Sequence, residues 1–164
     1  MKSLIKPIAV AIAIIIFANS FLNAQSFIDN PVQFDTKDSL HQLQKNYPVV
    51  YKHLLHEFKN VSSLFYTVKG NILFISFVNG NHKIFTVYSV NGEFSHSIAD
   101  LGLELPNTVS EQIRKQYPAY AVYYGKEIRT NEKNTYQVVI ENKYEYRLIN
   151  LLDTGIEEIK RLKK

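Results

Sequence analysis

The stretch LPNTVSEQIRKQYPAY, residues 105–120, has the pattern of a complete short helix. Val109, Ile113 and Tyr117 are four residues apart, so they fall on one stripe of a helix and can pack against a core. Pro118 disfavours a helical conformation for the residue before it and therefore ends the helix. The stretch predicts an amphipathic helix with a defined end.

The start of this helix is marked as well. Thr108 and Glu111 have the spacing of a capping box, in which each side chain bonds the backbone N–H of the other residue. Upstream, YPVVYKHLLHEFKN (residues 47–60) carries a second stripe, and Pro48 suits its first helical position. The residues of this stripe, each 59 positions before its counterpart, are Val50, Leu54 and Phe58. The chain is therefore predicted to build the same helix twice.

Runs of β-branched and aromatic residues follow each helix, over residues 63–99 and 121–155, and turn signals separate them. The short loops between the runs require antiparallel pairing. Residues 156–162 could be either a strand or a helix. Their position predicts a short fourth strand, but the spacing of their apolar side chains suits a helix better. The predicted fold class is α+β, with tandem helix-plus-antiparallel-sheet repeats and helices packed on one sheet face.

A family resemblance rests on residues 105–155, where LPNTVSEQIRKQYP precedes TYQVVIENKYEYRLINLLDTG. This order of helix, proline and strands resembles the PepSY-like, beta-lactamase-inhibitor-like domains of bacterial periplasmic proteins. The resemblance is weaker over residues 47–92 and does not cover residues 25–46. It implies a tandem α+β fold and an exported protein without an established catalytic activity.

The N-terminus has the pattern of a secretory signal peptide, residues 1–24. Lys2 and Lys6 precede an apolar run, and Ala24 stands before the predicted cut. The run is shorter than the roughly 20 residues of a membrane span, although an uncleaved anchor is the competing interpretation. Without cysteine the chain cannot be a thioether-linked lipoprotein. We expect a periplasmic or secreted protein with no stable membrane anchor after cleavage.

The mature chain divides into three predicted parts: residues 25–46, which pack on the first repeat, and repeats over residues 47–104 and 105–164. Removal of two lysines lowers the formal charge from +4 to +2. The one basic cluster, IKRLKK at residues 159–164, reads as a solvated tail. A nucleic-acid partner is therefore not expected.

No constellation of residues predicts catalysis, a metal or a cofactor. The stretch HLLHE places His53, His56 and Glu57 opposite the apolar stripe of their helix, so all three are predicted to be exposed. Their spacing differs from the H-E-x-x-H metal motif, and no third ligand is evident. The chain has no cysteine nucleophile and no G-x-S-x-G elbow. The chain is predicted not to be an enzyme.

Two binding functions remain. The first is recognition of an unknown protein partner, as a binding or inhibitor-like module, through a sheet face or loop tips; the second is sequestration of a small apolar ligand. Two groups of strand residues are predicted to face the helix: Tyr136, Val138 and Ile140, and Tyr144, Tyr146 and Leu148. The opposite face then mixes aromatic and polar groups, as protein interfaces do. The predicted partner-binding residues are Tyr123, Gln137, Glu145 and Arg147.

The run NILFISFV, residues 71–78, is apolar on both of its faces. One helix can bury only one of them, so the second face needs a cover. We expect residues 25–46 to supply it, through side chains that include Leu40 and Leu43. The alternatives are a partner protein and a second copy of the chain, which would make a homodimer.

Overall fold

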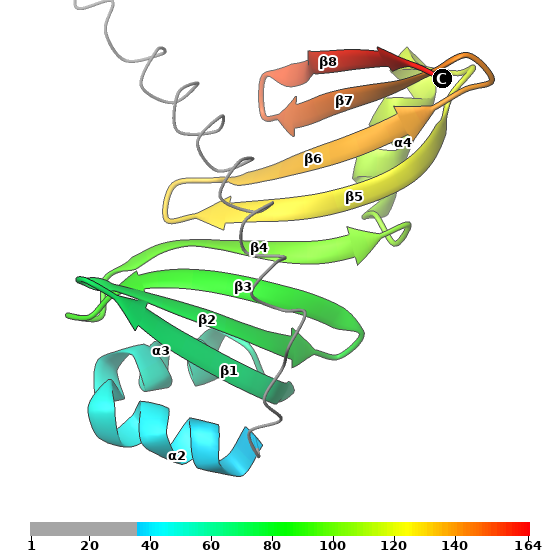
Figure 1. Cartoon of the computed structure of the whole chain (residues 1–164). Helices are drawn as coiled ribbons and strands as arrows, with labels where there is room; N and C mark the ends of the chain where they lie inside the picture. Colours follow the sequence, from blue (N-terminus) through cyan, green and yellow to red (C-terminus); the bar gives the residue numbers. More distant parts are fainter. Residues whose placement is uncertain (1–35) are drawn as a thin grey trace, which may run out of the picture. The chain divides into compact units, whose positions relative to one another are not determined.

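The structure, a computed structural model, describes residues 36–164, which form three helices and eight strands (Figure 1). The predicted signal peptide and residues 25–35 lie outside the described residues. In chain order the elements are α2 (Thr36–Asn46), α3 (Pro48–Glu57), β1 (Val61–Lys69), β2 (Ile72–Asn79), β3 (His82–Ser89), β4 (Phe94–Gly102), α4 (Asn107–Gln116), β5 (Ala121–Thr130), β6 (Asn134–Glu141), β7 (Glu145–Leu152) and β8 (Gly155–Lys163).

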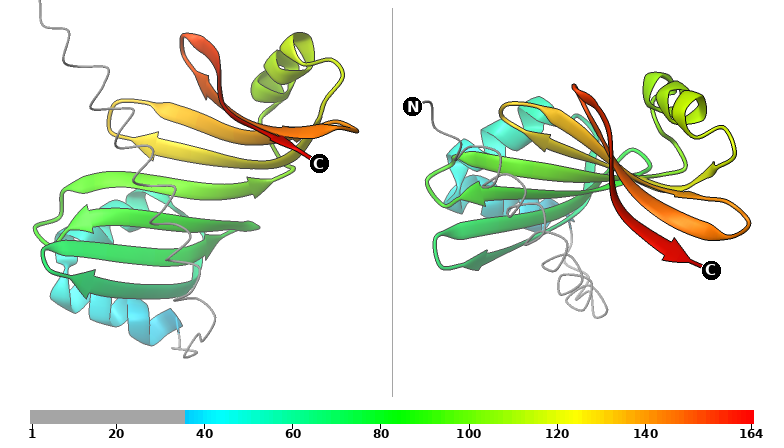
Figure 2. Two further views of the ribbon diagram at one scale, coloured as in Figure 1. Left: turned by 45° about the horizontal axis from the view of Figure 1, so that its top comes forward. Right: turned by 90° about the horizontal axis from the view of Figure 1, so that it is seen from above.

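The eight strands form one antiparallel sheet, in which strands that follow one another along the chain are neighbours. β4 pairs directly with β5, from His96 opposite Thr130 to Gly102 opposite Gly125. Figure 2 shows the twist that this single sheet acquires between β1 and β8. The prediction of tandem helix-plus-sheet repeats is therefore wrong. Two separate sheets would leave the edges of β4 and β5 unpaired, and their pairing satisfies those backbone groups.

The helices are distributed unequally along the sheet, two before β1 and one between β4 and β5. One row of paired residues crosses five strands in the order Ile84, Ala99, Glu127, Tyr136 and Leu151. The row begins in the core under α3 and ends in the core under α4. Both cores therefore lie on the same face of the sheet, which we call the helix-bearing face.

The apolar stripes of the helices supply these cores. Val50 and Leu54 of α3 are fully buried, and Val109 and Ile113 of α4 are 5% and 2% exposed. α2 adds Leu43 to the core under α3, where it is also fully buried. Burying each such side chain contributes about 1.5–3 kcal/mol, so the stripes fix which side of each helix meets the sheet.

The ends of both helices differ from the prediction. α3 ends before Phe58, whose extended backbone places its N–H on the carbonyl oxygen of Leu54. α4 starts at Asn107, after Pro106, and no side chain caps it. The capping box of Thr108 and Glu111 is therefore wrong, because Thr108 already lies inside the first turn.

The opposite side, which we call the helix-free face, carries none of the described helices. In the first half it remains apolar: Phe74 and Phe85 stack at 6.0 Å, and Ile72 is 44% exposed. Leu40 and Leu43 lie on α2 and pack into the core on the helix-bearing side, so they do not cover this face as expected. The rest of the expected cover, residues 25–35, lies outside the described residues.

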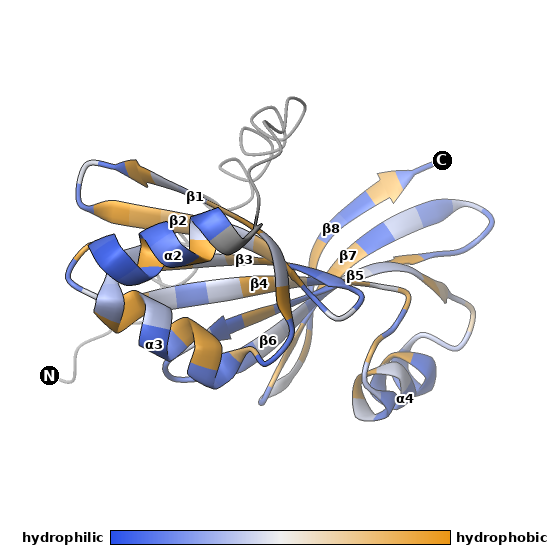
Figure 3. Ribbon diagram, turned by 90° about the horizontal axis from the view of Figure 1, so that it is seen from below, coloured by the Kyte–Doolittle hydropathy of each residue, from blue (hydrophilic) through white to orange (hydrophobic). Residues whose placement is uncertain are grey.

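The ambiguous segment at the C-terminus is a strand, because β8 pairs with β7 along its whole length. Leu151 opposes Ile156 and Glu145 opposes Lys163, with one bulge between these ends. Charged side chains dominate β8, and Figure 3 shows this strand as predominantly hydrophilic, in contrast to the hydrophobic β2 near the other edge of the sheet. Such charges disfavour pairing of an edge strand with another chain.

Candidate functional site

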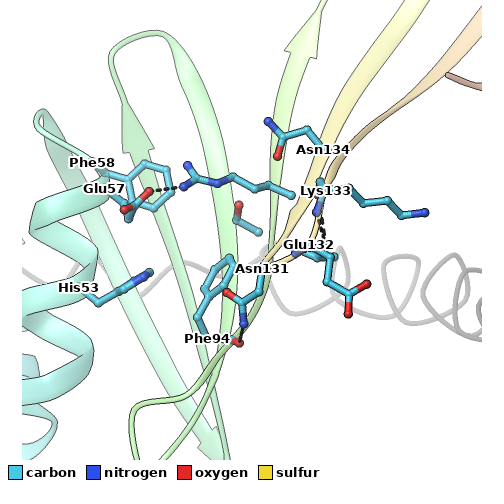
Figure 4. Close-up of a pocket in the computed structure, with 11 residues that line it drawn as sticks. His53, Glu57, Phe58, Phe94, Asn131, Glu132, Lys133 and Asn134 are labelled. Atoms are coloured by element: carbon cyan, nitrogen blue, oxygen red, sulfur yellow. Dashed lines mark hydrogen bonds and ion pairs between the residues drawn. The ribbon is translucent and has the colours of Figure 1, made fainter. Parts of the chain in front are cut away.

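A polar pocket lies on the helix-bearing face beside the C-terminal end of α3, and we call it the α3 pocket (Figure 4). Its volume is about 280 Å³. α3, β4, β5 and the β5–β6 turn all contribute to its wall. Its residues include His53, Glu57, Phe94, Ser97, Arg129 and Asn134.

The α3 pocket occupies the gap between the two helix-covered cores. Here the inward positions of the middle strands are polar: Ser97 on β4 opposes Arg129 on β5, which opposes Asn134 on β6. Polar groups in this row suit contact with water or a polar ligand, because burying them without hydrogen bonds is costly. The row thus explains why neither helix layer extends over it.

An ion pair closes one side of the α3 pocket. Arg129 donates through Nη2 to a carboxylate oxygen of Glu57, so α3 is tied to β5. His56 donates from Nδ1 to the other oxygen of Glu57 at 3.0 Å. The hydrogen bond from His56 and the charge of Arg129 lower the pKa of Glu57, which keeps the pair charged at neutral pH.

His53 faces the core more than its helical position predicted. Its Nδ1 hydrogen-bonds the Tyr88 hydroxyl at 3.0 Å, and its ring stacks on Phe94 at 5.4 Å. Burial raises the pKa of the Tyr88 hydroxyl, which therefore stays protonated. The prediction that His53 and Glu57 are exposed is wrong, since both are partly buried and the Glu57 side chain is 19% exposed. His56, with a side chain 82% exposed, lies in solvent as predicted.

Two of the predicted partner-binding residues, Glu145 and Arg147, lie on the helix-bearing face. Glu145 accepts hydrogen bonds from the Tyr120 hydroxyl, from Arg147 at 2.8 Å and from Arg161. Arg147 lies over the Tyr120 ring at 4.9 Å and also pairs with Glu158 at 2.8 Å. These contacts form a closed network at the ends of β7 and β8.

The hydrogen bond from Tyr120, followed by those from Arg161 and Arg147, lowers the pKa of Glu145 to about 2. Its side chain is 6% exposed, and its partners already occupy both oxygens. A carboxylate held in this way cannot act as a proton acceptor near neutral pH. The network therefore has the properties of a structural anchor.

The other two predicted residues, Tyr123 and Gln137, lie on the helix-free face. Tyr123 is 55% exposed and packs edge-on against Tyr146, with ring centroids 5.3 Å apart. Gln137 donates to the Asn150 side chain at 3.3 Å. The assignment of Tyr144, Tyr146 and Leu148 toward the helix is wrong. Pairing places Val138 opposite Ile149 and so turns Tyr146 and Leu148 to the helix-free face, and Tyr144 is 70% exposed before β7 begins.

A second pocket, also about 280 Å³, opens between the ends of β2, β3 and β4. Ile72, Val87, Tyr88 and Phe94 supply its apolar lining, and Glu93 is one of its polar neighbours. Both pockets are open to solvent, so neither encloses a ligand. Residues 36–164 contain no group of three or more His, Asp or Glu side chains that could hold a metal ion.

Among the described helices, none has the length and apolar character that crossing a membrane would take.

Comparison of the structure with solved proteins shows the fold. The chain is similar to a BLIP-like protein from Bacteroides fragilis, with a TM-score of 0.53 and 12% identity over 71% of this chain and 84% of that one. A DUF2874 family protein from Bacteroides uniformis gives a TM-score of 0.52 and 12% identity, covering 70% and 87%. The fold is BLIP-like, that is, beta-lactamase-inhibitor-like.

A third similar structure, from Bacteroides eggerthii, is provisionally described as a periplasmic protein. Its TM-score is 0.51, with 12% identity over 70% of this chain and 86% of that one. No protein-family model matches the sequence, and no curated protein matches it significantly.

Sequence reasoning missed the α3 pocket because its walls come from distant segments. Phe94, Ser97 and Arg129 lie on strands that flank α4, whereas His53 and Glu57 lie on α3. The available signal was local: SHSIA in β4 and KEIRT in β5 place polar residues at inward positions of otherwise apolar strands.

Proposed function

We propose that the chain is an exported, non-catalytic binding protein of the bacterial periplasm, which recognises a protein partner on the helix-free face of its sheet. The N-terminal pattern of a signal peptide supports export. The similar structures described as BLIP-like and as periplasmic support the same compartment and an inhibitor-like role.

One observation carries the proposal: a solvent-facing cluster of two tyrosines and a leucine on the helix-free face, formed by Tyr123, Tyr146 and Leu162, of which Tyr146 is partly buried. Tyr146 pairs directly with Leu162 across β7 and β8, and Leu162 is 52% exposed. Lys164 lies over the Tyr146 ring at 4.6 Å, so a charged group borders the aromatic surface. Tyrosine offers a large, rigid contact area at a low cost in conformational entropy.

The neighbouring residues of the cluster fit a protein interface. Gln137 supplies a polar group at the same face, and Glu141 opposes Tyr146 on β6. Interfaces combine such aromatic centres with a polar rim. Glu145 and Arg147 are not part of the proposed surface, because their hydrogen-bond network lies on the helix-bearing face.

The alternative, sequestration of a small apolar ligand, has less support in the described residues. Sites for such ligands are concave, mainly apolar and largely enclose the ligand. The two pockets are open to solvent, and the α3 pocket is polar. An apolar ligand would leave most of its surface in water at either place.

The proposal is tested by affinity capture from a periplasmic extract, with the exported chain as bait. Tyr123→Ala should weaken capture of the specific partner by about 2 kcal/mol or more, as expected for an aromatic residue at the centre of an interface. Leu103→Ala is the matched control, since Leu103 is a 68% exposed side chain in the loop before α4. A partner retained equally by the wild type and Tyr123→Ala would contradict the proposed surface.

Enzyme inhibition is the inhibitor-like form of this function. If the captured partner is an enzyme, the purified chain should lower its activity in a stoichiometric titration, and Tyr123→Ala should shift that titration. Capture without any effect on activity would leave a binding module and exclude the inhibitor role for that partner.

A further inference from the structure

From the α3 pocket we infer a second binding site, separate from the proposed protein-binding surface, for a neutral polyhydroxylated ligand such as one sugar ring. The site lies on the helix-bearing face, whereas Tyr123 and Tyr146 lie on the opposite one. Its volume of about 280 Å³ is near the lower limit of small-molecule sites, about 300 Å³.

The charges at the site select against an ionic ligand. The two charged side chains between α3 and β5, Glu57 and Arg129, are paired with each other. Glu132 and Lys133, which lie at the rim, carry opposite charges and point away from α3 in Figure 4. Neither an anion nor a cation would find an uncompensated partner here, so the ligand should be neutral.

Open hydrogen-bonding groups nevertheless face the pocket. Arg129 uses Nη2 for Glu57, and no described residue accepts a hydrogen bond from its Nε or Nη1. Asn134 donates its amide N–H to Glu127 at 3.2 Å, which leaves its Oδ1 as an acceptor. His53 uses Nδ1 for Tyr88, so its Nε2 is the remaining ring nitrogen.

One largely buried hydroxyl group, that of Ser97, extends this polar surface into the floor. Ser97 lines the pocket and is only 6% exposed, and its side-chain hydroxyl has no hydrogen-bond partner among the described residues. Thr86 pairs with Ser97 across β3 and β4, and its fully buried Oγ1 has no hydrogen-bond partner within residues 36–164, but Thr86 does not line the pocket. Buried hydroxyls are normally hydrogen-bonded, so the floor is built to receive a polar group.

Donors and acceptors thus alternate around one small space. A sugar hydroxyl both donates and accepts, so a single group can bond an Arg129 N–H and the Asn134 Oδ1 together. A peptide amide N–H only donates and its carbonyl only accepts, which matches this mixture less well. Phe94 and Phe58 at the wall supply apolar contact for the C–H edges of a ring.

The test uses the purified full chain with glucose, galactose and N-acetylglucosamine as probes, and saturation-transfer NMR and calorimetry as readouts. At least one sugar should bind in the millimolar range or tighter. Ser97→Ala should weaken that binding by about 3- to 10-fold, the effect of losing one neutral hydrogen bond. Ser76→Ala, a serine of β2 on the helix-free face, should leave binding unchanged.

Arg129→Lys is the second variant, because lysine keeps the charge opposite Glu57 but lacks the open guanidinium N–H groups. It should lower sugar affinity without shifting the unfolding midpoint appreciably. Glycylglycine serves as the competing probe of peptide chemistry. The inference would be overturned if none of the three sugars binds the wild type. It would also be overturned if Ser97→Ala and Arg129→Lys both bind sugar as tightly as the wild type does, or if the wild type binds glycylglycine more tightly than any of the sugars.

Discussion

Truncation of one core leucine tests whether the continuous sheet makes the molecule a single cooperative unit. Leu54 of α3 is fully buried and packs among Leu43, Val50 and Ile75. Leu54→Ala removes three carbon atoms, and at about 0.8 kcal/mol per buried CH₂ the lost transfer energy is about 2.4 kcal/mol. The cavity left behind raises the expected loss to about 2.7–5 kcal/mol.

A loss of this size is a large part of the typical 5–15 kcal/mol stability of a domain. Guanidinium unfolding should be followed by far-UV circular dichroism and by tyrosine fluorescence. The chain has 11 Tyr and no Trp, and seven of the tyrosines, from Tyr117 to Tyr146, lie after α4 begins. Fluorescence therefore reports mainly on the second half, whereas circular dichroism reports on both.

Because β4 pairs with β5, both signals should shift together in Leu54→Ala, although the substitution lies in the first half. Leu55→Ala is the matched control: Leu55 is the next residue of α3 but is 38% exposed, so its effect should be much smaller. Two separate unfolding transitions, with tyrosine fluorescence unaffected by Leu54→Ala, would refute the reasoning. The two halves of the sheet would then unfold independently.

Glu145→Gln should lower the unfolding midpoint at neutral pH. The native pKa of about 2 lies below the ordinary 4.5, so the carboxylate stabilises the fold above about pH 4.5 and loses this effect as the pH falls toward 2. The unfolding midpoint of the variant should therefore depend less on pH in this range. A midpoint that varies with pH as in the wild type would count against the network. Gly92→Ala should lower the free energy of unfolding by about 1–3 kcal/mol, since φ is +100° and a Cβ would lie 2.5 Å from Val49 Cγ1. An unchanged stability in denaturant unfolding would mean that the turn rearranges. His53→Ala should destabilise the fold measurably, because the ring stacks on a phenylalanine and bonds a core tyrosine, whereas His56→Ala should stay within about 0.5 kcal/mol; equal thermal shifts for the two would contradict these contacts.

Local patterns in the sequence located most of the secondary structure. The spacing of Val50 and Leu54, and of Val109 and Ile113, identified the buried sides of α3 and α4. Pro118 lies just beyond the end of α4, as the pattern predicted. These features depend on neighbours within one or two helical turns, so the sequence alone is sufficient for them.

The joining of the strands into one sheet was decided by tertiary structure. Similar patterns in the two halves indicated two equal repeats, but nothing local shows that β4 pairs with β5. The two strands are separated along the chain by α4, and their pairing depends on backbone groups that the sequence pattern does not reveal. The α3 pocket, built across this junction, could not be predicted for the same reason.

The orientation of β7 shows the same limit at the level of single residues. Both of its faces carry large side chains: Tyr146 and Leu148 on one, Arg147 and Ile149 on the other. Alternation therefore identified a strand but not which face is buried, and a shift of one residue exchanges the two. The pairing of Ile149 with Val138 in the core settles it, turning the arginine inward to its carboxylate and leaving Tyr146 on the open face.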